Sequence, residues 1–313
     1  MEPSVAERLA GQIATGNGAA GPGAPWPALL EAIRPRQWSK NVFVLAGIVF
    51  AGRLFEPRAD LRVLAVFAVF CAAASALYLA NDVADRLSDA HHPQKRLRAI
   101  ASGRLSPQLA RAVSGALAVV ALAGAALLNG ATLAIVAGYL LSSFAYSFGL
   151  KRVHLLDVML VASGFVLRAA AGAAAIDAEI SPWLLVCTFL LALFLALGKR
   201  RAELVLLGEE AHSHRVALGH YSLPLVDSWL TALSGAAIVS YALYTQSPRT
   251  VEHFGTTNLL YTVPFVIYAL FRYQGHVVRQ DAGGDPGSLI LQDRGLWLAL
   301  VGWALTAAVV IYR

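Results

Sequence analysis

Residues 61–89 read LRVLAVFAVFCAAASALYLANDVADRLSD, an apolar run that passes directly into a row of acids. About 20 consecutive apolar residues in a helix span the hydrocarbon layer of a bilayer. Lipid offers no hydrogen bonds to a free backbone, so a helix is the conformation expected for such a run. The stretch therefore predicts a transmembrane helix with a strongly polar end.

The rest of the chain has the same apolar character. Its 313 residues are 58% hydrophobic and 14% charged, and its mean hydropathy is +0.61, values that exclude an ordinary soluble domain. Apolar run length predicts nine spans, near 41–55, 61–80, 107–128, 131–148, 153–176, 182–198, 227–247, 258–272 and 295–312. The predicted fold class is an all-α polytopic membrane protein of about nine transmembrane helices, with polar loops capping one end.

The N-terminal region differs from the remainder. Residues 1–33 are rich in Gly, Ala and Pro at first and then contain a short amphipathic stretch, Trp26 to Ile33. We expect a flexible tail with a short interfacial helix, followed by a single transmembrane catalytic domain over residues 34–313.

Charge predicts the orientation. With nine spans, 18 of the 25 lysines and arginines fall on the side of the N-terminus. Cytoplasmic loops carry such an excess, so the N-terminus and the active site are predicted to be cytoplasmic, in the cell (inner or plasma) membrane. The net charge of +6 then reflects loop bias, and no nucleic-acid partner is expected. Cys71 and Cys187 lie in apolar runs and are interpreted as small hydrophobic residues.

The acids after the second span form the strongest motif. Asp82, Asp85 and Asp89 occupy positions i, i+3 and i+7, which place them within about 60° of arc if the helix continues. Carboxylate oxygens in that arrangement suit Mg²⁺ shared with substrate phosphates, and Asn81 adds a neutral oxygen. The alternative is a solvated helix end.

Cations follow in the same loop. Lys95 and Arg96 could contact phosphate oxygens, which would supply the second half of a diphosphate site. Cytoplasmic anchoring of the loop would produce the same residues.

The loop after the fourth span also combines cations with an acid. Lys151 precedes Asp157 at the mouth of an apolar span, and an acid there is costly without a partner or a metal. A functional Lys151–Asp157 pair and a plain structural ion pair are both open. Arg168, further along the span, must face the bundle interior or a water-filled cavity.

A third cationic group follows the sixth span. Lys199 and Glu203 are spaced to pair along a helix, which would direct Arg200 toward a phosphate. Lys199, Arg200 and Arg201 could instead contact anionic lipid headgroups. Taken together, the acids and cations at one end of the bundle predict a Mg²⁺-diphosphate pocket with apolar walls.

With these residues in place, the chain resembles the UbiA superfamily of intramembrane prenyltransferases. Its NDxxDxxxD signature is matched by Asn81, Asp82, Asp85 and Asp89. The usual second signature, DxxxD, is absent, and Tyr146, Lys151 and Asp157 give a YxxxxKxxxxxD pattern similar to that of the decaprenyl-phosphate phosphoribosyltransferase branch. Further likeness to that branch lies in Arg34-Pro35-Arg36-Gln37-Trp38-Ser39-Lys40-Asn41, Lys95-Arg96, Phe165-Val166-Leu167-Arg168 and Lys199-Arg200-Arg201-Ala202-Glu203-Leu204.

The resemblance implies transfer of 5-phosphoribosyl from 5-phosphoribosyl 1-diphosphate to a polyprenyl (decaprenyl) phosphate, which releases diphosphate and leads toward arabinan cell-wall precursors. It implies Mg²⁺ as cofactor, held by Asn81, Asp82, Asp85 and Asp89. Catalytic roles fall on Asp82, Asp85, Lys151 and Asp157, the last for a second metal or the ribose hydroxyls. The substrate-binding residues expected are Gln37, Lys40, Asn41, Lys95, Arg96, Tyr146, Arg168, Lys199, Arg200 and Arg201. A homo-oligomer, with a trimer as the expected form, is a further expectation.

Two other functions are open. A prenyltransferase of the same fold would move a prenyl group from its diphosphate to an aromatic acceptor of the quinone or haem type. A transporter or channel would also carry charges within its spans. Clustering of acids and cations at one face, with no paired broken helices at midplane depth, favours a transferase.

Overall fold

The computed structural model describes residues 25–92, 95–207, 216–280 and 286–312, and every regular element in these ranges is a helix. The long helices are α4 (Pro57–Ala84), α6 (Pro107–Leu128), α7 (Gly130–Phe148), α8 (Leu156–Ala175), α9 (Pro182–Leu207), α11 (Leu223–Gln246), α13 (Val263–Gln280) and α15 (Arg294–Tyr312). Shorter α-helices are α2 (Pro25–Ala32), α3 (Leu45–Phe50), α5 (Arg86–His91), α12 (Pro248–Phe254) and α14 (Pro286–Gln292). Five 3-10 turns connect them: η1 (Pro35–Val44), η2 (Lys95–Leu97), η3 (Leu150–Arg152), η5 (Val216–His220) and η6 (Asn258–Thr262).

The predicted helical membrane fold of about nine spans is confirmed, with the exact number approximate. Seven of the described helices are long and apolar enough to cross a membrane, and the number rises to eight if α12 and the helix after it, bent by 100°, form one broken span. The predicted first span, 41–55, is instead the end of η1 joined to the six-residue α3. Apolar run length alone does not distinguish a continuous helix from such a composite segment.

Local sequence explains where several helices begin. Ser106 and Asn129 cap α6 and α7, since each side-chain oxygen accepts a hydrogen bond from the backbone N–H three residues later. Proline occupies the first turn of α4, α6 and α11, where its missing N–H costs no helical hydrogen bond.

Two apolar clusters form the interior of the bundle. The first combines η1, α3, α4, α6, α7 and α8, with Phe70 and Val136 fully buried. The second combines α9, η5, α11, α13 and α15, with Phe194 and Leu230 fully buried. Helix α8 contributes to both, because its first turn places Val158 in the second cluster. The two halves of the bundle therefore meet along α8.

Small residues let α8 approach the first segment closely. Residues 169–175 read AAAGAAA, and a Cβ added at Gly172 would lie 1.9 Å from the carbonyl oxygen of Val44. The reciprocal position is Gly47, where a Cβ would lie 2.2 Å from the backbone nitrogen of Ala173. Backbone contact of this kind is typical of small-residue helix interfaces in membranes. It fixes η1 against α8.

The predicted short helix before the first span is present as α2. Ala28 and Ala32 are buried against Leu79 of α4 and Ile100 of the following loop, while Trp26 is exposed. The predicted flexible tail, up to residue 24, lies outside the described residues.

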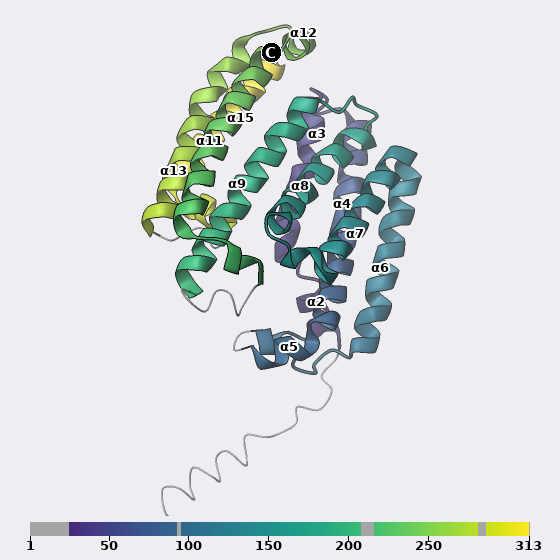
Figure 1. The fold of residues 1–313 in the computed structure, drawn as a ribbon. Helices are drawn as coiled ribbons and strands as arrows, with labels where there is room; N and C mark the ends of the chain where they lie inside the picture. Colours follow the sequence, from purple (N-terminus) through teal and green to yellow (C-terminus); the bar gives the residue numbers. More distant parts are fainter. Residues whose placement is uncertain (1–24, 93–94, 208–215, 281–285, 313) are drawn as a thin grey trace, which may run out of the picture.

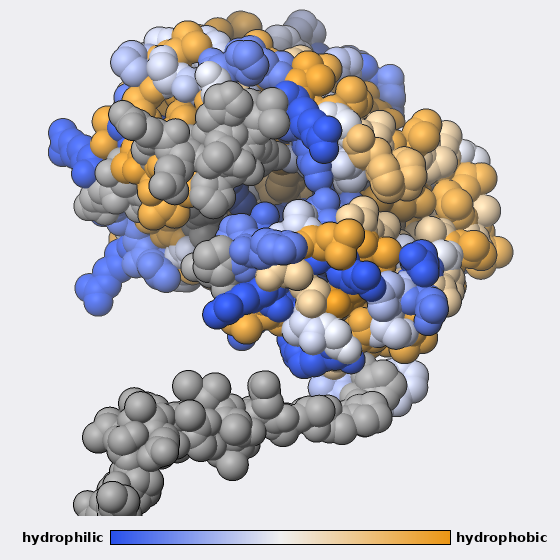
Figure 2. Space-filling model, turned by 60° about the horizontal axis from the view of Figure 1, so that its bottom comes forward, coloured by the Kyte–Doolittle hydropathy of each residue, from blue (hydrophilic) through white to orange (hydrophobic). Residues whose placement is uncertain are grey.

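The end of the bundle that carries α2 and α5 lies opposite α12 (Figure 1). Viewed from that end, hydrophilic side chains cover much of the face, and apolar side chains lie along its flank (Figure 2). This is the end at which α4 finishes and α8 begins, so both predicted motifs lie on it.

Candidate active site at the polar end of the bundle

The acidic motif, defined here as Asn81, Asp82, Asp85 and Asp89, lies at the break between α4 and α5. Helix α4 ends at Ala84 and Asp85 links it to α5, so the continuous helix expected from the sequence is interrupted. Asp82 and Asp89 nevertheless face a common partner. Their side chains are almost completely buried, whereas 40% of the Asp85 side chain is exposed.

Three cations contact the acids of this motif. Arg34 Nη2 lies 2.5 Å from Asp82 Oδ1, and Arg98 Nη1 lies 3.1 Å from the same oxygen and 2.7 Å from Asp89 Oδ2. Lys151 Nζ lies 3.6 Å from Asp85 Oδ1. Buried carboxylates need such partners, because removing a charge from water is costly unless it is paired.

Arg34 reaches Asp82 from an unusual backbone conformation. Its φ and ψ are 53° and 62°, the left-handed region that is rare for residues other than glycine, and its guanidinium lies 5.1 Å from the ring centre of Tyr78. Such a conformation costs about 1–3 kcal/mol and persists only where the surroundings impose it. The geometry indicates that the segment before η1 is held to present this cation.

Lys151 joins the two predicted motifs. Its expected partner was Asp157, but the structure directs it across the site to Asp85, 66 positions earlier in the sequence. This contact places the YxxxxKxxxxxD segment beside the acidic motif. The prediction that both motifs form one site is thus compatible with the geometry, although the partner was wrong.

Asp157 is sealed inside the protein. Its exposed fraction is 0%, Arg200 Nε donates to Oδ2 at 2.9 Å, and the Tyr221 hydroxyl donates to Oδ1 at 2.7 Å. Tyr221 also accepts a hydrogen bond from the backbone N–H of Leu155, a residue with a positive φ of 64°. Burial and the neighbouring Asp157 carboxylate raise the pKa of Tyr221, which keeps its hydroxyl protonated as a donor.

The sealed geometry gives Asp157, Arg200 and Arg201 protein partners, and their expected catalytic and substrate-binding roles stay predictions. Arg200 pairs with Glu203 at 2.5 Å as well as with Asp157, rather than pointing to a phosphate. Arg201 donates to Asp227 at 2.7 Å and to the carbonyl of Val277. Sequence spacing identified the cations but not the protein carboxylates that neutralise them.

Arg168 and Asn41 are also buried, and their expected contact with substrate stays a prediction. Arg168 donates to Asn41 Oδ1, to the carbonyl of Gly164 and to the Tyr139 hydroxyl, each at 2.8 Å. Its guanidinium also lies near the ring of Phe70. The interior location predicted for Arg168 is correct, and the side chain links η1, α7 and α8 there.

The remaining predicted substrate-binding residues retain solvent access. Lys40, Lys95, Arg96 and Lys199 are exposed, and Gln37 and Tyr146 are half-buried. Two residues absent from the sequence-based site, Arg34 and Arg98, make closer contacts to the acids than any of these. Arg34 lies in the quoted stretch Arg34 to Asn41, which was the available signal, and Arg98 follows Lys95 and Arg96 in the same loop.

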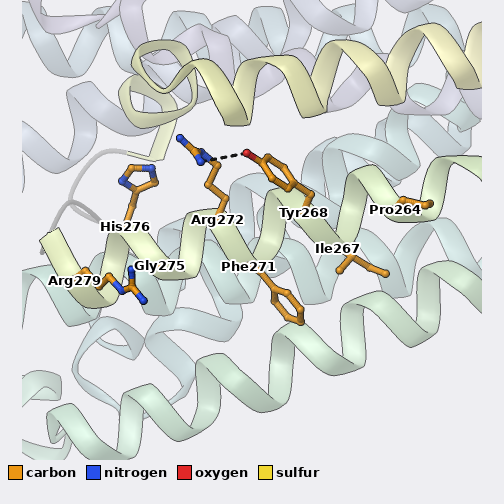
Figure 3. A pocket seen from close by; sticks show the side chains of 8 residues that line it. All are labelled: Pro264, Ile267, Tyr268, Phe271, Arg272, Gly275, His276 and Arg279. Atoms are coloured by element: carbon orange, nitrogen blue, oxygen red, sulfur yellow. Dashed lines mark hydrogen bonds between the residues drawn. The ribbon is translucent and has the colours of Figure 1, made fainter.

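A groove on α13 offers a contrast to this site (Figure 3). It has a volume of about 780 Å³ and is lined by residues from Pro264 to Arg279, none of which belongs to the predicted site. Arg272 and His276 both contact Asp293, and the Arg272 guanidinium holds the pKa of that carboxyl well below its usual range. Two basic side chains of the groove, Arg272 and His276, are thus paired with a protein acid.

The donor set of the acidic motif fits a metal shared with phosphate. Among the described residues, no three His, Cys, Asp or Glu side chains converge to hold a metal without other ligands. Mg²⁺ is commonly bound through one or two carboxylates together with substrate phosphates and water. Asp82 and Asp89, joined through one guanidinium nitrogen, supply that kind of partial site.

Comparison with known proteins agrees with the geometry. Residues 41–202 match the model of the UbiA prenyltransferase family. The decaprenyl-phosphate phosphoribosyltransferase of Corynebacterium glutamicum is 36% identical over 290 residues, which cover 91% of this chain and 86% of that protein. The enzyme of the same name from Mycobacterium tuberculosis is 35% identical, with 90% and 94% covered.

Solved structures show the same fold. A UbiA homologue from Archaeoglobus fulgidus bound to GPP and Mg²⁺ has a TM-score of 0.66 and 18% identity, and the match covers 91% of this chain and 97% of that one. The same homologue bound to DMAPP and Mg²⁺ gives a TM-score of 0.67. This chain is a multi-pass membrane transferase that belongs to the UbiA prenyltransferase family.

Proposed function

We propose that this protein transfers a 5-phosphoribosyl group from 5-phosphoribosyl 1-diphosphate to a polyprenyl phosphate, decaprenyl phosphate in the first instance, and releases diphosphate. The observation that carries the proposal is the contact of Lys151 with Asp85, which sets a phosphate-binding cation beside the acids of the NDxxDxxxD motif. The names of relatives 35–36% identical over about nine tenths of the chain support the same reaction.

The acidic motif would hold Mg²⁺ together with the diphosphate. Asp82, Asp85 and Asp89 offer carboxylate oxygens, and Asn81 offers an amide oxygen. When bound there, the metal supplies positive charge that neutralises the departing diphosphate. The Mg²⁺ found with prenyl diphosphates in the Archaeoglobus fulgidus homologue supports this cofactor.

The cations around the motif would stabilise phosphate oxygens as negative charge builds on the leaving group. Lys151, Arg34 and Arg98 lie within 3.6 Å of the acids. Each can therefore donate a hydrogen bond to a diphosphate that binds among them. Lys95 and Arg96 are exposed on the same loop as Arg98 and extend the positive field. Asp157 receives no substrate contact in this proposal.

The acceptor needs no general base. A phosphate oxygen of the lipid is already ionised at neutral pH and can attack the anomeric carbon as diphosphate leaves, which predicts inversion at that carbon. The apolar helices that flank the polar face suit a polyprenyl chain entering from the bilayer (Figure 2).

The protein would lie in the plasma membrane with its site on the cytoplasmic side, because most of the chain's cations are predicted at that end of the bundle. Labelling of single cysteines placed at Ser88 and at Thr256 in intact cells tests the orientation: a membrane-impermeant maleimide should react only at Thr256. Association into a homo-oligomer, with a trimer as the expected form, stays a prediction that native mass spectrometry of the purified protein would test.

The activity assay uses membranes containing the protein, decaprenyl phosphate and radiolabelled 5-phosphoribosyl 1-diphosphate. We expect a labelled lipid that forms only with a divalent cation and is lost in Asp85→Asn. No labelled lipid would exclude the phosphoribosyl reaction. The second candidate, supported by the prenyl diphosphates bound to the Archaeoglobus fulgidus homologue, predicts transfer of a labelled prenyl group to an aromatic acceptor instead.

A further inference from the structure

Each carboxylate of the acidic motif already has a cationic partner from this chain. Asp82 contacts Arg34 and Arg98, Asp89 contacts Arg98, and Asp85 contacts Lys151. Three negative charges thus face three positive ones. A divalent cation added to this balanced set would meet repulsion from the cations as well as attraction from the acids.

Arg98 occupies the position between the two buried acids. One of its nitrogens, Nη1, is within hydrogen-bond distance of both Asp82 Oδ1 and Asp89 Oδ2. A metal held by both carboxylates would take the place between these oxygens that Arg98 Nη1 now occupies. The guanidinium and the metal cannot both hold that place.

Solvent access shows which group can leave. The Asp82 and Asp89 side chains are 5% and 4% exposed, whereas that of Arg98 is 31% exposed. The backbone just after Arg98 is anchored, since Ala99 and Ile100 are buried in the cluster with α2 and α4. The Arg98 side chain can therefore turn toward solvent while its backbone stays fixed.

We propose that Arg98 competes with the divalent cation for Asp82 and Asp89, and that a diphosphate group releases it by accepting its hydrogen bonds. Metal and diphosphate then bind cooperatively, and the metal alone binds weakly. This inference rests on the proposed function, because it assigns the diphosphate of the sugar donor as the group that draws Arg98 away. Guanidinium–phosphate hydrogen bonds are charge-assisted and often bidentate, so the exchange replaces one strong contact with another.

The test measures binding without turnover, on the full-length protein in nanodiscs. Mn²⁺ binding is followed by the electron paramagnetic resonance of the free ion, and binding of radiolabelled pyrophosphate is followed separately by equilibrium dialysis with and without Mn²⁺. We expect Arg98→Gln to tighten the binding of Mn²⁺ alone by about tenfold, within the range usual for coupled sites. Mn²⁺ should strengthen the binding of pyrophosphate to the wild type, and it should do so much less in the Arg98→Gln variant.

Arg86→Gln is the matched control. Arg86 lies between Asp85 and Asp89 in sequence and is exposed on α5, so its loss changes the net charge of the motif equally. Equal effects of Arg86→Gln and Arg98→Gln would reduce the result to net charge and overturn the proposal. Tight Mn²⁺ binding by the wild type that Arg98→Gln leaves unchanged would also overturn it. Arg98→Lys serves if the glutamine variant does not fold, and it should give an intermediate affinity.

The outcome is separable from that of the proposed function. If the labelled lipid forms but Mn²⁺ affinity is the same in the wild type and in Arg98→Gln, only the proposed competition by Arg98 is rejected. Absence of the labelled lipid together with Mn²⁺ binding that tightens in Arg98→Gln rejects only the phosphoribosyl reaction.

Discussion

The two acid-bearing regions of the polar face use their charges in opposite ways. In the acidic motif, the cations lie toward solvent over the carboxylates, and Arg34, Arg98 and Lys151 are each about 30% exposed. At the start of α8, Asp157 and Arg200 are both sealed, with side chains 0% and 6% exposed. A cation that can move is available to a ligand, whereas a sealed pair holds helices together. The two regions have similar sequence patterns of acids and bases. Solvent exposure therefore distinguishes the charges that can bind a ligand from those that stabilise helix packing.

The sharpest test of this comparison is Asp85→Asn. It removes the most exposed carboxylate of the acidic motif and the partner of Lys151. We expect the rate of labelled-lipid formation to fall by about 10³-fold, because single groups that act electrostatically in an active site contribute 10²–10³-fold. The melting temperature should stay within a few degrees, since exposed pairs add little stability. A large loss of stability with activity retained would contradict the assignment.

Asp157→Asn tests the other region and should act mainly on stability. Arg200 would be left buried with one carboxylate partner fewer, and breaking a buried pair from one side costs about 3–5 kcal/mol. The measurement is the midpoint of thermal unfolding in detergent, compared with Asp227→Asn. Arg201, the partner of Asp227, also keeps the Val277 carbonyl, and Asp227 is more exposed than Asp157, so the smaller loss is expected there. If the Asp157→Asn protein kept its stability but lost its activity, Asp157 would be a catalytic residue and not a structural one.

The sequence predicted the elements of the site better than their pairing. The NDxxDxxxD spacing located the acids because it is local, and run length located most spans for the same reason. The Lys151–Asp85 contact joins residues from different loops, and the buried Asp157–Arg200 pair joins two helices. Such pairs depend on how helices pack, and spacing along one helix contains no information on that packing.

Backbone geometry was also beyond sequence patterns. Arg34 precedes a proline, a position that usually favours extended backbone, yet it adopts a left-handed conformation that aims its side chain at Asp82. The first predicted span departs from a continuous helix for a related reason. Its residues are apolar enough to cross the membrane, but the close approach of Gly47 and Gly172 fixes them as a 3-10 segment and a short helix against α8.

Lys151→Gln should have a smaller effect than loss of Asp85, because Arg34 and Arg98 remain to contact phosphate. We expect kcat to fall by about 10²-fold with modest change in stability, as for the loss of one stabilising donor. Arg152→Gln is the control, since Arg152 is the exposed neighbour of Lys151 in η3. Initial rates over a range of sugar-diphosphate concentrations separate kcat from KM. Equal losses in the two variants would mean that Lys151 acts only through the general positive charge of the loop.

Tyr221→Phe probes the sealed region most gently. It removes one hydrogen bond to Asp157 and the acceptor for the Leu155 N–H, and such bonds contribute about 0.5–1.5 kcal/mol each, or 1.5–3 kcal/mol to a charged group.

The raised pKa of Tyr221 also predicts a pH dependence. Because the folded protein keeps the phenolic proton above the usual tyrosine pKa of about 10, its stability should fall as the pH rises beyond that value. The phenylalanine variant lacks this proton, so its melting temperature should decline less between pH 9 and 11. If the melting temperatures of the two proteins declined in parallel, unfolding would not change the pKa of the Tyr221 hydroxyl. That result would contradict a buried hydrogen bond from Tyr221 to Asp157.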